Sequence, residues 1–169
     1  MRTIASITAS LALTLSAQAN ASDDEHAPIP ASCPVIVAAP QTRFTPPPPS
    51  KANAAGDPVF WYGTDSLYTH LRSDGRWSGI KSETGTRNKS FWYRKNPEWL
   101  MENPYQFMLT AKRLESDEAE FTLTGSDVTN AIMGEEVAML TMLELPARGC
   151  WEITGNYKDA YLSFVVWLE

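Results

Sequence analysis

Apolar and polar residues alternate with a period of two along most of the chain after residue 58. The stretch 160–168 is the clearest case, because one set of alternate positions is wholly apolar and the other set is mixed. Successive side chains of a strand point to opposite faces, so this pattern predicts a strand with one face on a core and the other half exposed. Further strands are predicted where short stretches, separated by turn residues, either alternate in the same way or are rich in aromatic and β-branched residues: 60–62, 67–71, 76–80, 91–93, 106–114, 120–124, 137–145 and 150–154. About eight closely spaced strands predict an all-β fold, an immunoglobulin-like β-sandwich.

Two regions of this pattern need a choice between local structures. Asp74-Gly75 is a strong hairpin signal and predicts that 76–80 returns along 67–71. Residues 126–145 fit helical spacing in part, but Gly134 interrupts that spacing at a cost of about 1 kcal/mol relative to alanine. We therefore predict a loop through Gly134 followed by a strand over 137–145.

The mature chain is expected to begin with a proline-rich segment, 22–58, that precedes the folded domain at 59–169. Nine of the twelve prolines fall between Pro28 and Pro58. Prolines lack the backbone donor and favour an extended path, so we predict a disordered or extended tether. An edge strand near 33–37 is its one expected attachment to the domain.

Residues 1–21 have the three parts of a secretory signal peptide. A positive start at Arg2 precedes an apolar run from Ile4 to Leu15, and small residues end at Ala19 and Ala21. This run is shorter than the roughly 20 residues that cross a bilayer, and no later segment is long and apolar enough. We predict cleavage after Ala21, no membrane insertion after cleavage, and a periplasmic or secreted protein.

Charge and cysteine content narrow the partners and the compartment. The full chain has a net charge of −6, and loss of Arg2 with the signal peptide makes the mature chain more acidic. This balance argues against nucleic acid as the partner, although the chain has a local basic cluster at Arg87, Lys89, Arg94 and Lys95. The only two cysteines, Cys33 and Cys150, predict one disulfide in an exported chain, with two separate thiols as the alternative.

The C-terminal block resembles a family of uncharacterised exported bacterial proteins. Its stretches 149–155 (Gly-Cys-Trp-Glu-Ile-Thr-Gly) and 162–165 (Leu-Ser-Phe-Val) are similar to the family's Gly-Cys-Trp-Glu-Val-Thr-Gly and Leu-Thr-Phe-Val. The family also begins with Cys-Pro-Val, as at 33–35 here. The resemblance implies an immunoglobulin-like fold and assigns no biochemical role. Arg148 stands where immunoglobulin domains have a tyrosine two residues before the second cysteine, which leaves the strand order open.

Residues suited to catalysis or metal binding are few, and we expect no cofactor and no metal site. The two histidines are His26 in the acidic start and His70 in a predicted strand, and neither adjoins a nucleophile motif. Cys150 with His70 as a cysteine nucleophile competes with the disulfide. An envelope hydrolase that uses clustered carboxylates remains an alternative, with candidates Asp57, Asp65 and Asp74. An inhibitor of an external enzyme is another.

Aromatic content is the unusual feature, with six tryptophans and two Phe-Trp-Tyr triplets at 60–62 and 91–93. Three consecutive aromatics in a strand cannot share a face, so at least one of each triplet must be covered by a second layer or exposed. Exposed aromatic rings bind sugars and protein partners, whereas buried ones fill a core. We predict a non-catalytic module that binds a protein or glycan at the cell envelope, with binding residues Trp61, Tyr62, Trp92, Tyr93 and Trp99.

Overall fold

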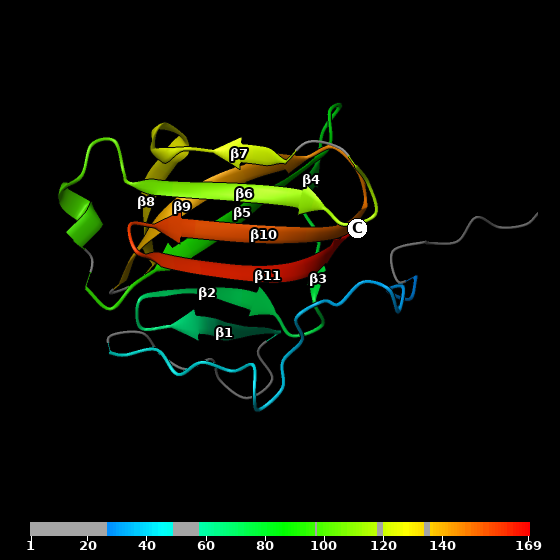
Figure 1. Cartoon of the computed structure of the whole chain (residues 1–169), viewed down its shortest axis with the longest axis horizontal. Coiled ribbons are helices and arrows are strands. Elements are labelled where there is room, and N and C mark those ends of the chain that lie inside the picture. The colour runs from blue at the N-terminus through cyan, green and yellow to red at the C-terminus, as the bar shows by residue number, and fades with distance from the viewer. Residues whose placement is uncertain (1–26, 49–57, 97, 118–119, 134–135) are drawn as a thin grey trace, which may run out of the picture.

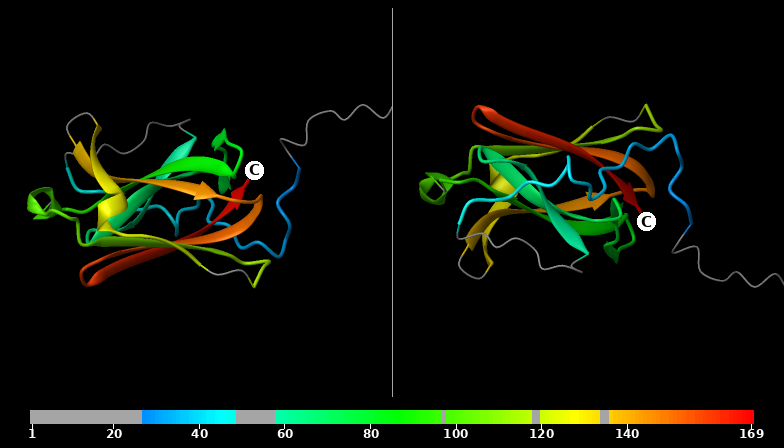
Figure 2. Two further views of the ribbon diagram at one scale, coloured as in Figure 1. Left: turned by 90° about the horizontal axis from the view of Figure 1, so that it is seen from above. Right: turned by 90° about the horizontal axis from the view of Figure 1, so that it is seen from below.

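The chain folds into two packed β-sheets, which confirms the predicted all-β sandwich (Figures 1 and 2). The computed structural model describes residues 27–48, 58–96, 98–117, 120–133 and 136–169. The predicted signal peptide, 1–21, lies outside these residues. Within them, no helix has the length and apolar content that a membrane span requires.

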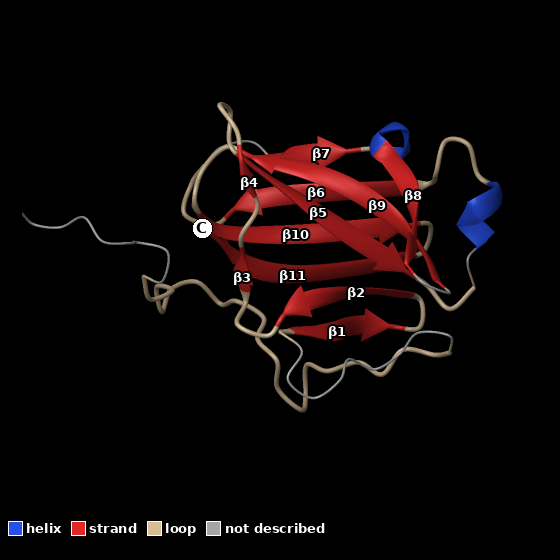
Figure 3. Cartoon of the chain, turned by 180° about the vertical axis from the view of Figure 1, so that it is seen from behind, coloured by secondary structure: helices blue, strands red, loops and turns tan. Residues whose placement is uncertain are grey.

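The first sheet has the strand order β1-β2-β5-β9-β8, and β4 pairs with the start of β5. All its pairings are antiparallel. The strands are β1 (Val59–Thr64), β2 (Leu67–Arg72), β4 (Ile80–Lys81), β5 (Thr86–Tyr93), β8 (Val128–Met133) and β9 (Glu136–Leu145). Figure 3 views the sandwich from the side of this sheet.

The second sheet has the order β3-β11-β10-β6-β7. Its strands are β3 (Arg76–Trp77), β6 (Phe107–Arg113), β7 (Phe121–Leu123), β10 (Gly149–Tyr157) and β11 (Ala160–Leu168). Only β3 and β11 run parallel. The described chain adds two short 3-10 helices, η2 (Glu98–Met101) and η3 (Gly125–Asp127).

The core lies between the sheets and is built from the alternate positions that the sequence pattern marked. Every member of the apolar set of β11 is buried, at Ala160, Leu162, Phe164, Val166 and Leu168. Trp92 of β5 is fully buried against them, with its ring 5.6 Å from that of Phe164. Burial of such side chains is the dominant favourable term in folding, so this shared core holds the two sheets together.

The expected hairpin at Asp74-Gly75 is wrong. The turn forms, since the Arg76 N–H donates to Asp74 Oδ1 at 3.0 Å, but it leads to β3 in the second sheet. Trp77 there pairs with Leu168 of β11. The physical reason is the burial of Trp77, which packs in the core with its ring 5.9 Å from that of Phe164 of β11, so the chain after the turn joins the second sheet.

The expected loop before Gly134 is also wrong, and so is the helical alternative. Residues 128–133 form β8, which pairs with β9 in an unbroken register from Val128↔Thr141 to Met133↔Glu136. Val128 is the only buried side chain of this strand. The strand is therefore held by its backbone ladder rather than by an apolar pattern, which explains why the sequence did not indicate it.

Of the proline-rich segment, the structure describes residues 27–48, which form no helix or strand and are a packed arm rather than the predicted disordered or extended tether. The arm donates hydrogen bonds from Ile36 N–H to the second sheet (Val165 O, 2.9 Å) and from Phe44 N–H to the first (Trp61 O, 2.9 Å). The suggested strand at 33–37 does not form, because Pro34 has no donor and the Val35 N–H bonds back to Cys33 O at 2.9 Å. The arm thus connects the two sheets along one side of the sandwich (Figure 1).

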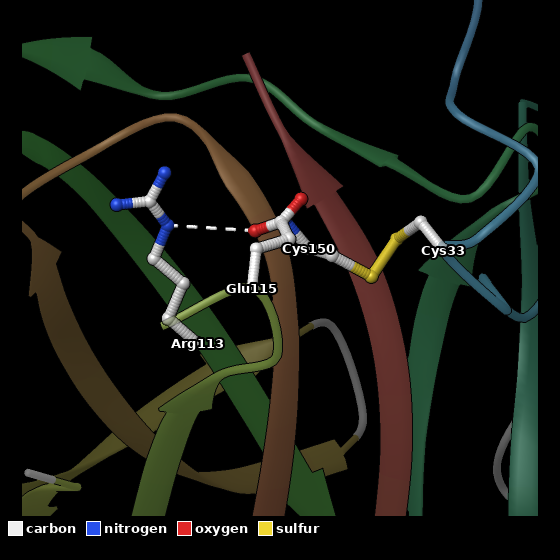
Figure 4. The surroundings of a disulfide bond; sticks show 4 residues. All are labelled: Cys33, Arg113, Glu115 and Cys150. Carbon is white, nitrogen blue, oxygen red and sulfur yellow. Dashed lines mark hydrogen bonds and ion pairs between the residues drawn. A yellow bond between two sulfur atoms is a disulfide. The ribbon is translucent and has the colours of Figure 1, made fainter. Parts of the chain in front are cut away.

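A disulfide joins Cys33 of this arm to Cys150 of β10, which confirms the predicted pair (Figure 4). The Cys150 N–H donates to Glu115 Oε2 at 2.9 Å, and the same oxygen lies 3.4 Å from Arg113 Nε. Gly149 has φ of +142° and no room for a side chain against Glu115. These contacts fix the start of β10, to which the arm is attached.

A charged cluster holds the loop after η2 against the turn between β10 and β11. Glu102 Oε1 accepts the Tyr157 hydroxyl at 2.7 Å and lies 2.8 Å from Lys158 Nζ, while its Oε2 accepts the Gln106 N–H at 3.0 Å. Lys158 has φ of +54°, the only left-handed backbone among the described non-glycine residues. Burial opposes ionisation of Glu102, but these three bonds outweigh it and keep the pKa of its carboxyl below the usual value.

We expect Glu102→Gln to lower the free energy of unfolding at pH 7 and to make it less dependent on pH. A folded-state pKa below the unfolded value of about 4.3 means that Glu102 stabilises the protein above that pH, and the contribution is lost as the pH falls through the folded value. Urea unfolding at pH 7, 5 and 3 should show a gap between wild type and variant that narrows toward pH 3. Glu98→Gln is the matched control, because that side chain is 63% exposed and lies 3.5 Å from the same Lys158. A gap for Glu102→Gln that is equal at all three pH values would contradict the expectation.

Candidate functional site

Each Phe-Trp-Tyr triplet is split between the two faces of the first sheet, as strand geometry requires. In β1, Phe60 packs into the main core while Trp61 points to the outer face of the sheet. In β5 the order is reversed, because Trp92 packs inward and Tyr93 outward. The outer face therefore carries a second apolar cluster, separate from the core, which we call the outer aromatic layer: Trp61, Tyr68 and Tyr93.

The arm packs on this layer through Phe44, whose ring is tilted against that of Tyr68 at 5.2 Å. The predicted binding residues are not an exposed patch, because each lies in this layer or packs in or against the main core. Four of the five predicted residues are buried and Tyr62 is half-buried: Trp61 is 8% exposed, Tyr93 3%, and Trp92 and Trp99 are fully buried. Burial also raises the pKa of the Tyr93 hydroxyl well above its usual value, with Glu136 adding to the effect. These rings pack the protein, and a ligand site must be sought beside them.

Strands β2 and β5 diverge next to the outer aromatic layer (Figure 3). A groove lies between them there. The two strands pair only at Tyr68↔Tyr93 and Thr69↔Trp92. Beyond these pairs lie two adjoining hollows of about 160 and 630 Å³. The first is lined by Val59, His70, Arg72, Trp77, Ser78, Asn88, Lys89, Ser90 and Phe91, and the second by Ser78, Gly79, Ile80, Arg87, Asn88, Lys89 and Met142.

The groove also contains an unpaired edge of β5. On the side of β5 away from β9, β4 covers residues 86–87 and β2 covers residues 92–93. Residues 88–91 between them have no strand partner on that side within the described chain. Two side-chain hydrogen bonds lie along this edge. The Thr69 hydroxyl donates to Phe91 O at 2.7 Å, and the Asn88 carboxamide donates from Nδ2 to Ser78 O at 3.2 Å.

The lining of the groove is cationic and apolar in a chain that is acidic overall. It includes Arg72, Arg87 and Lys89 but no carboxylate. Asp74 pairs with Arg72 at 2.7 Å and Glu144 with Arg87 at 2.7 Å, whereas Lys89 has no ion-pair partner among the described residues. Hydrogen bonds from Ser82, Thr84 and Arg87 lower the pKa of Glu144 to about 2, so the carboxylate that balances Arg87 stays ionised. Ile80 and Met142 add exposed apolar surface, 76% and 52% exposed.

Two carboxylates of the hydrolase alternative, Asp65 and Asp74, do not lie together. Asp65 lies in the turn before β2 and Asp74 in the turn after it, about 20 Å apart along a six-residue strand. Asp65 pairs with Lys95 at 3.2 Å, and Asp57 lies outside the described residues. Cys150 is in the disulfide, so the cysteine–histidine alternative is wrong, while His70 stacks 5.4 Å from Phe91.

Sequence reasoning missed most of the groove, but one signal was present. Arg87 and Lys89 stood out within a basic cluster in an acidic chain, but the strand was predicted only over 91–93. The structure extends that strand to Thr86–Tyr93, so Arg87, Lys89 and Phe91 are alternate residues that form one row along β5. The sequence did not place Ile80 or Met142 beside them. Residues 76–80 were expected to return along 67–71, whereas β4 pairs with the start of β5, and β9 reaches β5 through a pairing remote in the sequence.

The fold and the groove define a two-sheet β-sandwich protein with an interrupted strand edge on the outer face of one sheet. No protein-family model, no curated protein and no solved structure matches this chain.

Proposed function

We propose that this protein is an exported, non-catalytic binding module, and that the groove beside β5 takes an extended, acidic segment of a partner protein at the cell envelope. The interrupted ladder of β5 carries the proposal. An unpaired strand edge offers N–H and C=O groups in the spacing that an extended chain matches, and such edges bind peptides by strand addition.

The side chains around that edge agree with a polypeptide ligand. Alternate residues of an added strand would meet the row formed by Arg87, Lys89 and Phe91. The unpaired Lys89 favours a carboxylate, and Ile80 and Met142 favour apolar side chains. Aliphatic surface of this kind suits a protein better than a glycan, so we favour the protein of the two expected ligand classes.

Export is part of the same proposal. We propose that residues 1–21 are removed as a signal peptide and that the mature protein is periplasmic or secreted. The disulfide between Cys33 and Cys150 supports this compartment, since disulfides persist in oxidising environments. The resemblance of 149–155 and 162–165 to exported bacterial proteins also supports export. From the same resemblance we propose that the strand arrangement is immunoglobulin-like.

The binding proposal is tested by titrating the mature protein, labelled with ¹⁵N, with a ten-residue peptide of alternating glutamate and valine. We expect saturable amide shifts at 88–91, and we expect Lys89→Glu to weaken binding on the order of tenfold through like-charge repulsion. Lys112→Glu is the matched control, because Lys112 is an exposed lysine at the outer face of the other sheet. Equal weakening by both variants, or shifts of equal size with a lysine–valine peptide, would overturn the groove as the site.

The natural partner is sought by placing a photo-cross-linking residue at position 80 and, as control, at position 161. Ile80 and Tyr161 are almost equally exposed, 76% and 75%, but lie on different sheets. We expect an envelope product from position 80 that Lys89→Glu diminishes, and none of the same mass from position 161. A product that forms equally from both positions contradicts a specific groove.

A further inference from the structure

The 3-10 helices η2 and η3 lie toward the same end of the sandwich (Figures 1 and 3). The loop after η2 contacts η3 there, and a second hollow is lined by residues of both. It measures about 530 Å³. In contrast to the groove, its lining includes no cationic side chain and is rich in neutral polar groups. They are one carboxamide and three hydroxyls, from Asn103, Tyr105, Ser126 and Thr129, with Glu102 beside them.

The wall formed by Glu102 is held in place from three sides. Tyr157, Lys158 and the Gln106 N–H occupy its two carboxylate oxygens, as described above. Lys158 reaches it from a left-handed backbone position that side chains rarely adopt, which is the sort of constraint found at functional sites. Because Lys158 balances the charge of Glu102, this wall does not favour an ion over a neutral ligand.

The opposite wall is equally fixed. Gly125 lies so close to the backbone of Tyr105 that a side chain has no space there. Asp127 closes η3 by accepting the Thr124 N–H at 2.9 Å. Trp99, fully buried, supports the Tyr105 ring edge-on at 5.7 Å. Trp99, which the sequence suggested as a binding residue, therefore acts by positioning Tyr105.

Several polar groups on these walls remain available to a ligand. The side chains of Asn103, Tyr105 and Thr129 have no hydrogen-bond partner within the described parts of the chain, and Ser126 bonds only to Thr124 at 3.0 Å. Together they offer both donors and acceptors around a concave surface that also includes Val128. Rigid polar groups that converge on a hollow are the usual basis of small-ligand specificity.

We propose that this hollow binds a neutral sugar. The hydroxyls of a sugar ring each donate and accept, which matches a lining of hydroxyls and a carboxamide, and its apolar ring face matches Tyr105. The site shares no residue with the groove beside β5, so a sugar and a partner protein bind independently.

The test is a titration of the ¹⁵N-labelled mature protein with three neutral disaccharides: cellobiose, maltose and N,N′-diacetylchitobiose. We expect saturable shifts for at least one of them, confined to 102–106 and 124–129. Asn103→Ala and Thr129→Val should each weaken that sugar about 2- to 10-fold, the effect of losing one hydrogen bond. Ser126→Ala provides a third variant if either of these fails to fold.

Lys89→Glu in the groove should leave sugar binding unchanged, and Asn103→Ala should leave binding of the glutamate–valine peptide unchanged. These two controls separate failure of the sugar site from failure of the proposed function. Absence of saturable shifts with all three sugars, or unchanged affinity in the folded variants, would overturn the sugar site.

Discussion

Removal of the disulfide between Cys33 and Cys150 is expected to lower the free energy of unfolding by about 3–5 kcal/mol. The bridge spans 117 residues. The chain-entropy model gives about 5 kcal/mol for a loop of this size, and measured bridges more often give about 2–4 kcal/mol. Such a loss is a large part of the stability of a domain of this length. Equilibrium urea unfolding of the oxidised and the reduced wild-type protein measures it directly, because both have the same side chains.

The double variant Cys33→Ala/Cys150→Ala should behave as the reduced protein does. Phe44→Ala is a useful control, since it loosens the arm near the outer aromatic layer and leaves the bridge intact. We expect reductant to destabilise Phe44→Ala but not the double variant. If reduction left the unfolding midpoint of the wild type unchanged, the bridge would contribute nothing to stability and the expectation would fail.

Trp92→Ala is expected to cost about 3–5 kcal/mol, the range for removal of a large buried aromatic side chain. Trp92 is fully buried between the sheets, with ring centroids 5.3 Å from Phe107 and 5.6 Å from Phe164. Its indole N–H donates to Ser90 Oγ at 2.8 Å, and Ser90 lies 2.6 Å from Thr141 Oγ1. Alanine would leave a cavity in the core and remove the donor to Ser90. Thermal or urea unfolding would measure the total loss in free energy of unfolding from both changes.

Two further variants separate these contributions. Trp92→Phe keeps most of the ring but loses the buried hydrogen bond, so we expect a loss of about 1–3 kcal/mol. Trp167→Ala removes a half-buried tryptophan from the outer side of β11, where we expect about 1 kcal/mol or less. Similar losses for Trp92→Ala and Trp167→Ala would show that Trp92 is not the centre of the core.

The proline-rich segment shows how local sequence can predict conformation without predicting packing. Proline content indicated an extended path, because the ring fixes φ and removes the donor. It did not indicate that Phe44 and Ile36 would pack on opposite sheets, since those contacts depend on Trp61 and Val165 being brought alongside. The disulfide was predictable only because the chain has no other cysteine to pair.

The candidate site was predictable only in part, for a related reason. The sequence marked Arg87 and Lys89 as basic residues but predicted a strand only over 91–93, so the structure alone shows that they share a row with Phe91. The gap in the ladder beside them arises because β5 meets β4 at one end and β2 at the other. Neither pairing is encoded in the residues 88–91 that the gap exposes.

By itself, the sequence determined the period-two pattern, the all-β class, the apolar face of β11 and the single disulfide pair. The first three follow from the side chains of neighbouring residues, and the disulfide pair follows from the presence of only two cysteines in the chain. Only the tertiary structure decided that β8 is a strand, that β3 joins the second sheet, and that Trp61 faces outward while Trp92 faces inward. A strand's two faces are equivalent until a partner sheet buries one of them, and its hydrogen bonds are made to segments far away in the chain.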